Sequence, residues 1–282
     1  TDRTTFFSTY GAASRLDLSA VGGDLTLAND ASIPGAEFLV FDNFGPQGRS
    51  VLASTADLLP LTVYPGSLSA IAAQGDLRIA NGFDLFPSAR GELSLFAGRH
   101  VIIGADGVVA VINQSDVAPA QLPSISRPAA NLLELGARFG VLAPPPAGDA
   151  SYFHDPNVLH ADDELPVRVI AAHGDIRASA SSVLVTAESA SLFAGRDFDG
   201  LSLSAQNLRE TDATTIRAGR DLFFATARTA SGGVQNLNQR LQVAGPGTAQ
   251  ILAGRTVDLG TSAGVTTVGD TLNPALAETG AQ

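Results

Sequence analysis

One short phrase recurs along the chain and constrains the fold more than any other feature of the sequence. It consists of an aliphatic residue, any residue, Ala, two residues that include Gly, usually Asp, and an apolar residue. Six copies occupy residues 71–77, 95–101, 170–176, 192–198, 216–222 and 251–257, and a weaker copy occupies residues 21–25. Because such a short unit cannot bury its own apolar side, repetition of this kind is typical of solenoids, in which each repeat packs on its neighbours.

The spacing of the copies gives the period of the repeat. The Asp position of the phrase falls at residues 24, 76, 100, 175, 197, 221 and 256, so the successive separations are 52, 24, 75, 22, 24 and 35 residues. We interpret 24 as one period, 52 as two, 75 as three, and 35 as one period plus an insertion within Ser231–Gly247. Roughly nine to eleven coils are then expected, which would span ~45 Å at the spacing of neighbouring strands.

Within each copy the apolar positions alternate, as in Leu192, Ala194 and then Phe198, and this is the period of a strand. The Gly permits a sharp bend, so each copy is expected to form a strand, a corner and a second strand. Stacked units of this kind predict an all-β fold, a parallel β-helix, which the crossover rule makes right-handed. Two inward columns are expected, one of Ile71, Leu95, Ile170, Leu192, Ile216 and Ile251, and one of Ala73, Ala97, Ala172, Ala194, Ala218 and Ala253.

Two stretches depart from the repeat. Residues 113–166 are rich in Pro, which cannot donate a ladder hydrogen bond, so this Pro-rich segment is expected to leave the coil. Its prolines include Pro119, Pro123, Pro128, Pro144, Pro145 and Pro146. Inside it, Ala129–Val141 has a weak helical spacing that is compatible with a short surface helix. Residues 260–282 lose the strand pattern and are expected to form an irregular end.

Apart from these stretches, residues 1–282 are interpreted as a single β-helix segment. The chain begins with Thr1 and not with Met, which suggests a piece of a larger protein. The net charge is −11 and all 17 basic residues are Arg, which argues against sequence-independent binding of nucleic acid. There is no Cys for a disulfide framework, and no apolar run approaches the ~20 residues of a membrane span.

Gly260-Thr261-Ser262-Ala263-Gly264 fits the Gly-x-Ser-x-Gly pattern that exposes a nucleophilic Ser. That motif requires a strand followed by a helix, and no helical pattern follows it here. We therefore interpret this stretch as a corner of the coil.

An acidic cluster lies near the end of the Pro-rich segment. It comprises Asp155, Asp162, Asp163 and Glu164, with His154 and His160 among them. Carboxylates suit hard cations and imidazole suits transition metals, so the cluster could hold a divalent cation. Its spacing lacks the Asp-x-Asp-x-Asp-Gly pattern of a calcium loop. We therefore favour a solvated loop and predict no metal ligand.

The corner residues Arg196, Asp197, Arg220 and Asp221 would lie on adjacent coils, where a polysaccharide-cleaving β-helix could place its acid and base groups. The same residue types recur at the same corner, whereas a catalytic set is normally unequal. A ladder of turn-closing Asp and exposed Arg is the favoured interpretation. The chain also has only three Tyr and no Trp to stack on sugars. We predict no catalytic residue and no cofactor, and we do not expect an enzyme.

Several passages carry a further resemblance: Tyr64–Leu68, Leu85–Ser88, Gly91–Leu95, the four Ala-Gly-Arg copies, Gln206–Leu208 and Val268–Leu276. From about Leu58 onward the chain resembles the large exoproteins related to filamentous haemagglutinin, which two-partner secretion exports across the bacterial outer membrane. It is similar to a domain of unassigned function in their later β-helical region. The resemblance implies a right-handed β-helix in a secreted protein of the bacterial cell surface, with an outer-membrane secretion partner.

Three functions are compatible with these observations. The expected one is a structural shaft or adhesin segment, a monomeric coil that presents binding regions away from the cell to an unidentified receptor or glycan. The alternatives are a carrier stalk for a C-terminal toxin in contact-dependent inhibition, and a polysaccharide lyase or hydrolase on a β-helix. The repetition favours the shaft, because most of the pattern serves stacking.

Overall fold

The computed structural model describes residues 10–28, 41–42, 50–51, 62–104, 108–122, 124–126, 154–235 and 239–282. Three sheets of seven parallel strands dominate it. The first sheet contains β1 (Arg15–Ala20), β6 (Ser67–Ala72), β9 (Leu93–Ala97), β12 (Val167–Ala171), β15 (Ala190–Ala194), β18 (Ala213–Ala218) and β23 (Thr248–Ala253). The second contains β2 (Leu25–Leu27), β7 (Leu77–Ile79), β10 (Val101–Ile103), β13 (Ile176–Ala178), β16 (Phe198–Asp199), β19 (Leu222–Phe223) and β24 (Val257–Asp258).

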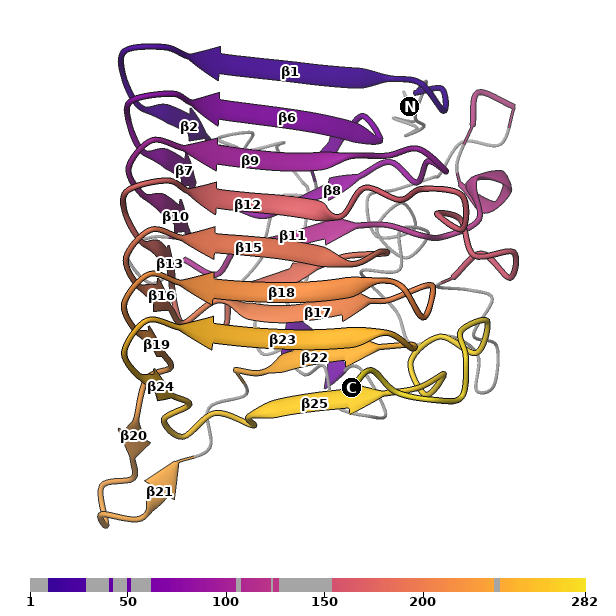
Figure 1. Ribbon diagram of the computed structural model, residues 1–282. Helices are drawn as coiled ribbons and strands as arrows, with labels where there is room; N and C mark the ends of the chain where they lie inside the picture. Colours follow the sequence, from indigo (N-terminus) through magenta and orange to yellow (C-terminus); the bar gives the residue numbers. More distant parts are fainter. Residues whose placement is uncertain are drawn as a thin grey trace, which may run out of the picture.

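The third sheet contains β5 (Val63–Tyr64), β8 (Phe83–Leu85), β11 (Val111–Gln114), β14 (Val183–Val185), β17 (Ser202–Gln206), β22 (Leu241–Ala244) and β25 (Val265–Val268). Each coil contains three strands, one from each sheet, and the coils stack along one axis (Figure 1). In Figure 1 the chain runs leftward along the front sheet, turns behind at the left, and returns rightward at the back while it descends. This winding is right-handed, so the predicted right-handed parallel β-helix is confirmed.

The expected number of coils is wrong, because the described residues form seven. β1 pairs directly with β6 and β9 pairs directly with β12. The separations of 52 and 75 residues are therefore one coil plus an insertion each, and not two and three coils. Six strand spacings give a stack of about 29 Å between the first and last coil.

Three insertions interrupt the coils between strands. The first lies between β2 and β5 and includes the antiparallel pair β3 (Phe41–Asp42) and β4 (Ser50–Val51). The second lies between β11 and β12. The third lies between β19 and β22 and includes the antiparallel pair β20 (Ala227–Arg228) and β21 (Val234–Gln235), which projects at the lower left of Figure 1.

The second insertion corresponds to the predicted Pro-rich segment. The strand β11 continues through Gln114, so the first two residues of the predicted segment, Asn113 and Gln114, still belong to the coil. After it, the described residues contribute a 3₁₀-helix η1 (Pro119–Gln121) and turns but no strand of the three sheets before β12. The helix expected over Ala129–Val141 lies outside the described residues.

The prediction of an irregular end over residues 260–282 is wrong in one respect. The strand β25 lies within it and pairs in parallel with β22, from Leu241 with Val265 to Ala244 with Val268. Beyond β25 the chain forms turns without further strands. Val265 is exposed, which shows why alternation at this edge strand gave a weak signal.

The predicted Ala column is shifted by one residue in two coils. The residues in register on the first sheet are Ala20, Ala72, Ala97, Ala171, Ala194, Ala218 and Ala253. Ala73 and Ala172 lie in the corners instead. The reason is that corners have two lengths, with three residues before Asp76 and Asp175 but only two before Asp197 and Asp221.

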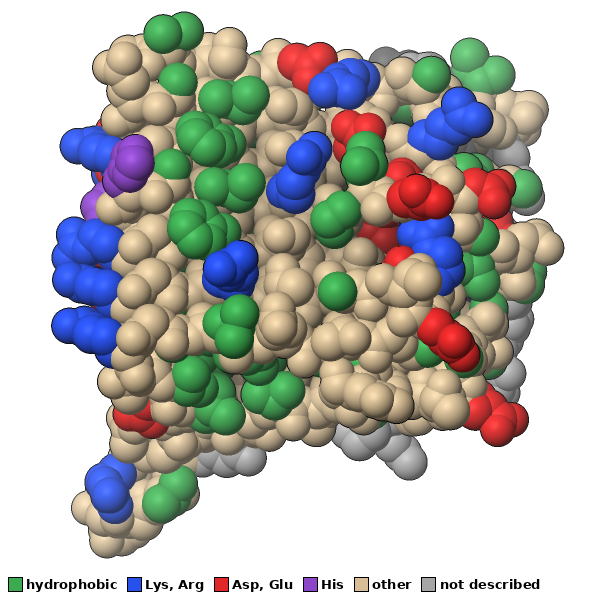
Figure 2. All heavy atoms as spheres, viewed as in Figure 1, with side chains coloured by type: hydrophobic (Ala, Val, Ile, Leu, Met, Phe, Trp, Pro, Cys, Tyr) green, Lys and Arg blue, Asp and Glu red, His purple; other side chains and the backbone are tan. Residues whose placement is uncertain are grey.

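The aliphatic column changes for the same reason. The inward residues are Ala70, Leu95, Val169, Leu192, Ile216 and Ile251. Ile71 and Ile170 point outward, together with Phe96, Phe193 and Leu252, and Figure 2 shows hydrophobic side chains on this face. Inside, the three sheets meet in one apolar core that includes Val101, Ile112, Ile176, Leu184, Phe198 and Leu203.

Candidate functional site

The corner between the first and second sheets carries a ladder of hydrogen bonds. Each corner Asp accepts a hydrogen bond from the backbone N–H at the same position of the next coil. These contacts run from Asp76 N–H to Asp24 (2.8 Å), His100 N–H to Asp76 (3.2 Å), Asp197 N–H to Asp175 (3.1 Å), Asp221 N–H to Asp197 (3.2 Å) and Thr256 N–H to Asp221 (3.2 Å). In the third coil, where His100 stands in place of the Asp, His100 Nδ1 accepts the N–H of Asp175 at 3.0 Å.

Arginine side chains cover this ladder from outside. Arg220 binds Asp197 through two nitrogens, one of them Nε at 3.0 Å from Oδ1. The hydrogen bonds from Arg220 and from the backbone of Asp221 lower the pKa of Asp197 below its ordinary value. Arg255 repeats the arrangement on Asp221. The resulting row of Arg lies along the left edge in Figure 2.

The structure thus places Arg196, Asp197, Arg220 and Asp221 in contacts that close and stack the corners. Arg196 Nε lies 3.7 Å from Asp175 Oδ1. The carboxylates of Asp197 and Asp221 are each occupied by an Arg and by a backbone amide. An acid or base catalyst needs a side chain with a free site for a proton, which this repeated arrangement does not favour.

The Gly-x-Ser-x-Gly stretch lies in a turn between β24 and β25. Gly260 and Gly264 adopt positive φ values of 51° and 81°. Ser262 Oγ accepts a hydrogen bond from the N–H of Gly264 at 3.1 Å, and the next element in the described chain is the strand β25. The geometry is that of a loop closed by its Ser, without the helix that a nucleophile elbow requires.

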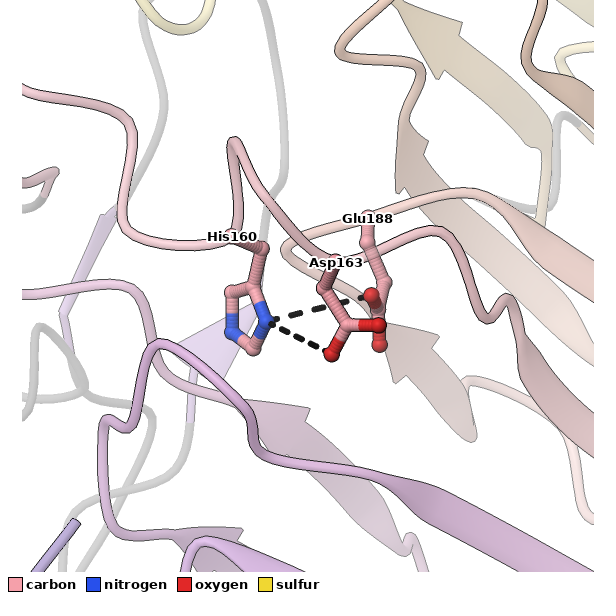
Figure 3. A group of neighbouring side chains, drawn as sticks. All are labelled: His160, Asp163 and Glu188. Atoms are coloured by element: carbon pink, nitrogen blue, oxygen red, sulfur yellow. Dashed lines mark ion pairs between the residues drawn. The ribbon is translucent and has the colours of Figure 1, made fainter.

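A different set of side chains converges inside the molecule. His160 and Asp163 come from the loop that leads into β12, and Glu188 comes from the turn between β14 and β15 (Figure 3). His160 Nδ1 lies 4.0 Å from Asp163 Oδ2 and 3.8 Å from Glu188 Oε2. The exposed fraction is 1% for His160 and 3% for Glu188. The cluster therefore joins a buried imidazole and a buried carboxylate to the half-buried carboxylate of Asp163.

Glu188 is held by the neighbouring coil. Gln114, at the end of β11, donates from Nε2 to Glu188 Oε1 at 2.8 Å and to the carbonyl oxygen of Gly91 at 2.9 Å. The amide oxygen Oε1 of Gln114 accepts the N–H of Ala187 at 3.0 Å. These bonds fix the carboxylate so that Oε2 faces His160, and none of the described residues donates a hydrogen bond to Oε2.

Asp163 is held by its own loop and by Arg209. Its Oδ1 accepts the N–H of Leu165 at 3.0 Å, and its N–H donates to the carbonyl oxygen of His160 at 2.9 Å. The guanidinium of Arg209 donates to the carbonyl oxygens of Ala161, at 3.2 Å, and of Asp163. The loop is thereby fastened to the turn after β17, with Asp163 Oδ2 directed at the imidazole.

Burial controls the charge of this cluster. It raises the pKa of Glu188 to about 8 and lowers the pKa of His160, because both charged forms lose their hydration. Among the described residues, no group hydrogen-bonds either ring nitrogen of His160. A buried polar atom without a partner costs free energy, so the cluster is not explained by internal hydrogen bonding.

A second polar group adjoins the cluster. His154 Nδ1 lies 2.7 Å from Asp116 Oδ2, and Gln206 Nε2 donates to the same oxygen at 3.0 Å. Gln206 in turn accepts a hydrogen bond from Asn273 Nδ2 at 2.8 Å. Burial opposes ionisation of Asp116, but its contacts with His154 and Gln206 outweigh this and lower its pKa. This group is therefore satisfied within itself.

The solvated-loop interpretation of the acidic cluster is wrong for His160, which is buried, and for Asp163, which faces it. The same interpretation is correct for Asp162 and Glu164, whose side chains are exposed. Sequence reasoning missed Glu188 because it belongs to a different coil. One signal was present: Glu188 is the only charged residue between Arg177 and Arg196.

No family model, curated protein or solved structure matches the chain. Across the described residues, no helix has the length and apolar character needed to cross a membrane.

Proposed function

We propose that the chain is a structural shaft segment of a secreted bacterial surface exoprotein, and that it presents binding regions away from the cell. The observation that carries the proposal is the corner ladder, in which the charged side chains of one coil close the next coil. Stacking of this kind produces a rigid rod whose length grows with the number of coils. Asp197 and Asp221, whose carboxylates are of the type used in acid–base catalysis, are engaged in that stacking.

The edges of the stack also suit a shaft. β1, β2 and β5 at one end, and β23, β24 and β25 at the other, each have a neighbour in the three sheets on one side only. At the end formed by β23, the N–H of Ala249 already donates to the carbonyl oxygen of Gln282 at 2.8 Å, so this edge is partly covered. At the β1 end a strand edge can accept a further parallel strand, and each further coil would extend the rod by ~4.8 Å. The resemblance to exoproteins related to filamentous haemagglutinin supports an adhesin role at the cell surface, after export through an outer-membrane partner. A carrier stalk for a toxin would use the same rod.

The test is the removal of one complete coil. Deletion of residues 77–100 joins Asp76 to Val101 and leaves β6 to pair with β12 in the same Ala register. If coils serve only as stacked units, this variant should fold into six coils and keep the β-sheet circular dichroism spectrum of the full-length chain.

The matched control is deletion of residues 77–88, which removes half a coil and places strands of different sheets next to one another. We expect this shorter deletion to unfold the chain, because the inward faces no longer meet. A whole-coil deletion that unfolds as completely as the half-coil deletion would contradict the shaft proposal, since the coils would then not be interchangeable units.

A further inference from the structure

The cluster of His160, Asp163 and Glu188 contains polar atoms for which the described residues supply no hydrogen bond. Both nitrogens of His160 and Oε2 of Glu188 are buried and unpartnered. Protein interiors rarely leave such atoms unpaired, since each unpaired atom has lost its hydrogen bonds to water without replacement. The contacts at 3.8 and 4.0 Å are too long for hydrogen bonds between the side chains. Something else must therefore fill the space to which the three groups point.

The orientation of the carboxylates indicates which kind of group lies between the three side chains. In Glu188 and Asp163 one oxygen is fixed by a hydrogen bond, from Gln114 and from the N–H of Leu165, while the other is directed at His160. Figure 3 shows the imidazole nitrogen and the two carboxylates pointing toward one another. Fixed orientation by outer contacts is what carboxylate and imidazole ligands of metal ions typically have.

We propose that His160 Nδ1, Asp163 Oδ2 and Glu188 Oε2 bind a divalent transition-metal ion of the zinc class. The ligand atoms all lie within 4.8 Å of one another. In a tetrahedral zinc site with bonds of about 2.1 Å, neighbouring ligand atoms are about 3.4 Å apart. The two distances from His160 Nδ1, 4.0 and 3.8 Å, would therefore shorten by about half an ångström when the ion binds. Three protein ligands leave the fourth position to a water molecule.

The donor set favours zinc over calcium or magnesium. Ca²⁺ takes six to eight oxygen ligands and Mg²⁺ a near-octahedral oxygen shell, whereas one imidazole and two carboxylates suit Zn²⁺. Burial agrees with this choice. Glu188 is only 3% exposed, and buried charged groups in proteins are normally paired with an opposite charge or coordinate a metal. Arg209 lies nearby, but its guanidinium is bonded to Asp212 and to carbonyl oxygens.

The ion would act as a staple between segments that are distant in sequence. His160 and Asp163 belong to the return of the Pro-rich segment into the coil, and Glu188 belongs to the corner between β14 and β15. A bond from each segment to one ion fixes the start of β12 against the stack. Because the ion binds the folded chain only, it should stabilise that state by mass action.

The experiment uses the purified 282-residue chain after treatment with a chelator and dialysis. Zn²⁺ is titrated in competition with a chromophoric chelator, and Co²⁺ is added separately to record its visible absorption. We expect one equivalent of Zn²⁺ to bind, a visible Co²⁺ spectrum with the intensity of tetrahedral coordination, and a rise in the thermal midpoint with Zn²⁺. Ca²⁺ and Mg²⁺ at the same concentration should not shift the midpoint.

Two variants that keep their outer hydrogen bonds locate the site. Glu188→Gln can still accept from Gln114, and Asp163→Asn can still accept from Leu165. Each should bind Zn²⁺ at least tenfold more weakly and lose the Zn²⁺-dependent rise in midpoint, while circular dichroism in chelator stays that of the wild type. Asp162→Asn, an exposed acid of the same loop, is the control and should bind as the wild type does.

The proposal is overturned if the wild type binds no Zn²⁺ at one equivalent, or if Glu188→Gln and Asp163→Asn both bind as tightly as Asp162→Asn. Should one of the two variants not fold, the other decides. A midpoint that rises equally with Ca²⁺ or Mg²⁺ would contradict the assignment to the zinc class.

Discussion

At the scale of single residues, the corner carboxylates of Asp197 and Asp221 each bind one backbone N–H and one Arg. Asp197 accepts the N–H of Asp221 and binds Arg220. The amide contact lies at the strand edge between coils, where an unpaired N–H would be costly, while the Arg contact faces solvent. The backbone hydrogen bond should therefore contribute more to stability than the ion pair.

Two substitutions at Asp197 separate these contributions. Asp197→Ala removes both contacts and should lower the free energy of unfolding by about 1–3 kcal/mol, because the N–H of Asp221 loses its acceptor. Asp197→Asn keeps an oxygen for that N–H and should lose less. Urea denaturation of both variants measures the difference. Equal losses would show that the ion pair, and not the amide contact, is what matters at the corner.

Asp84 should make stability depend on pH. It is buried on β8 and accepts a hydrogen bond from Asn113 Nδ2 at 2.7 Å, and burial raises its pKa to about 7. A carboxyl whose pKa is raised in the folded state stabilises that state below its unfolded pKa of about 4, and the contribution is lost as pH rises to about 7.

Asp84→Asn cannot ionise, so this variant does not lose stability as the pH rises. The variant should therefore be more stable than the wild type at pH 8, with a difference that shrinks by about 1.4 kcal/mol per pH unit between pH 7 and pH 4. Thermal midpoints of the two proteins across this range measure it. A difference that is independent of pH would mean that Asp84 ionises in the folded chain as it does in water.

At the scale of elements, the corners between strands require Gly where coils approach each other. A Cβ on Gly219 would overlap the carbonyl oxygen of Gly195 in the preceding coil, and one on Gly254 would overlap that of Gly219. Gly23, in the first coil of the described stack, has no atom within 4 Å of such a Cβ. The close approach, and not the bend alone, is what selects Gly at these two corners.

Gly219→Ala should consequently lower the free energy of unfolding by about 1–3 kcal/mol, as overpacking usually does. Gly23→Ala should change it by no more than about 0.5 kcal/mol, in the range of ordinary surface substitutions. Chemical denaturation of the pair compares the two. If Gly23→Ala is as harmful as Gly219→Ala, then chain flexibility and not contact between coils explains the glycines.

The elements also show how far the sequence could be interpreted. The alternation around Leu192 and Ala194 was sufficient to predict parallel strands and a β-helix, because the inward face of a strand repeats every second residue. The shift at Ala73 and Ala172 could not be predicted, since a corner of three residues and a corner of two produce the same phrase. Insertion lengths near multiples of the period likewise hid the true number of coils.

The candidate site was less predictable. His160 and Asp163 were recognised as possible ligands, but a sequence does not show whether a loop folds inward. Their partner Glu188 lies on another coil. It is held in place by a hydrogen bond from Gln114, which is 74 positions away in the sequence. Contacts of this range follow from the stacking and not from local pattern.

At the scale of the whole molecule, a shaft should lack turnover. The purified chain is expected to leave uronan and neutral glycan substrates uncleaved, because the corner acids are occupied and repeated. Release of reducing or unsaturated ends is the measurement. Turnover that Asp197→Asn or Asp221→Asn alone abolishes would contradict the shaft proposal and favour a polysaccharide-active enzyme.

The stack should also fail locally when a charge is placed inside it. Ala194 is fully buried on β15, between Ala171 and Ala218. Ala194→Asp places a carboxylate there without a partner, which costs several kcal/mol unless it is neutralised. Arg217→Asp, an outward position on the neighbouring strand β18, is the matched control and should be tolerated.

Hydrogen exchange followed by mass spectrometry tests the central claim that each coil is held by its neighbours. In Ala194→Asp, amide protection should fall first in β12, β15 and β18, while β6 and β7 at the far end keep theirs. Arg217→Asp should retain protection throughout. A uniform loss of protection in Ala194→Asp would contradict the account, because the chain would then unfold as one indivisible unit and not as a stack of coils.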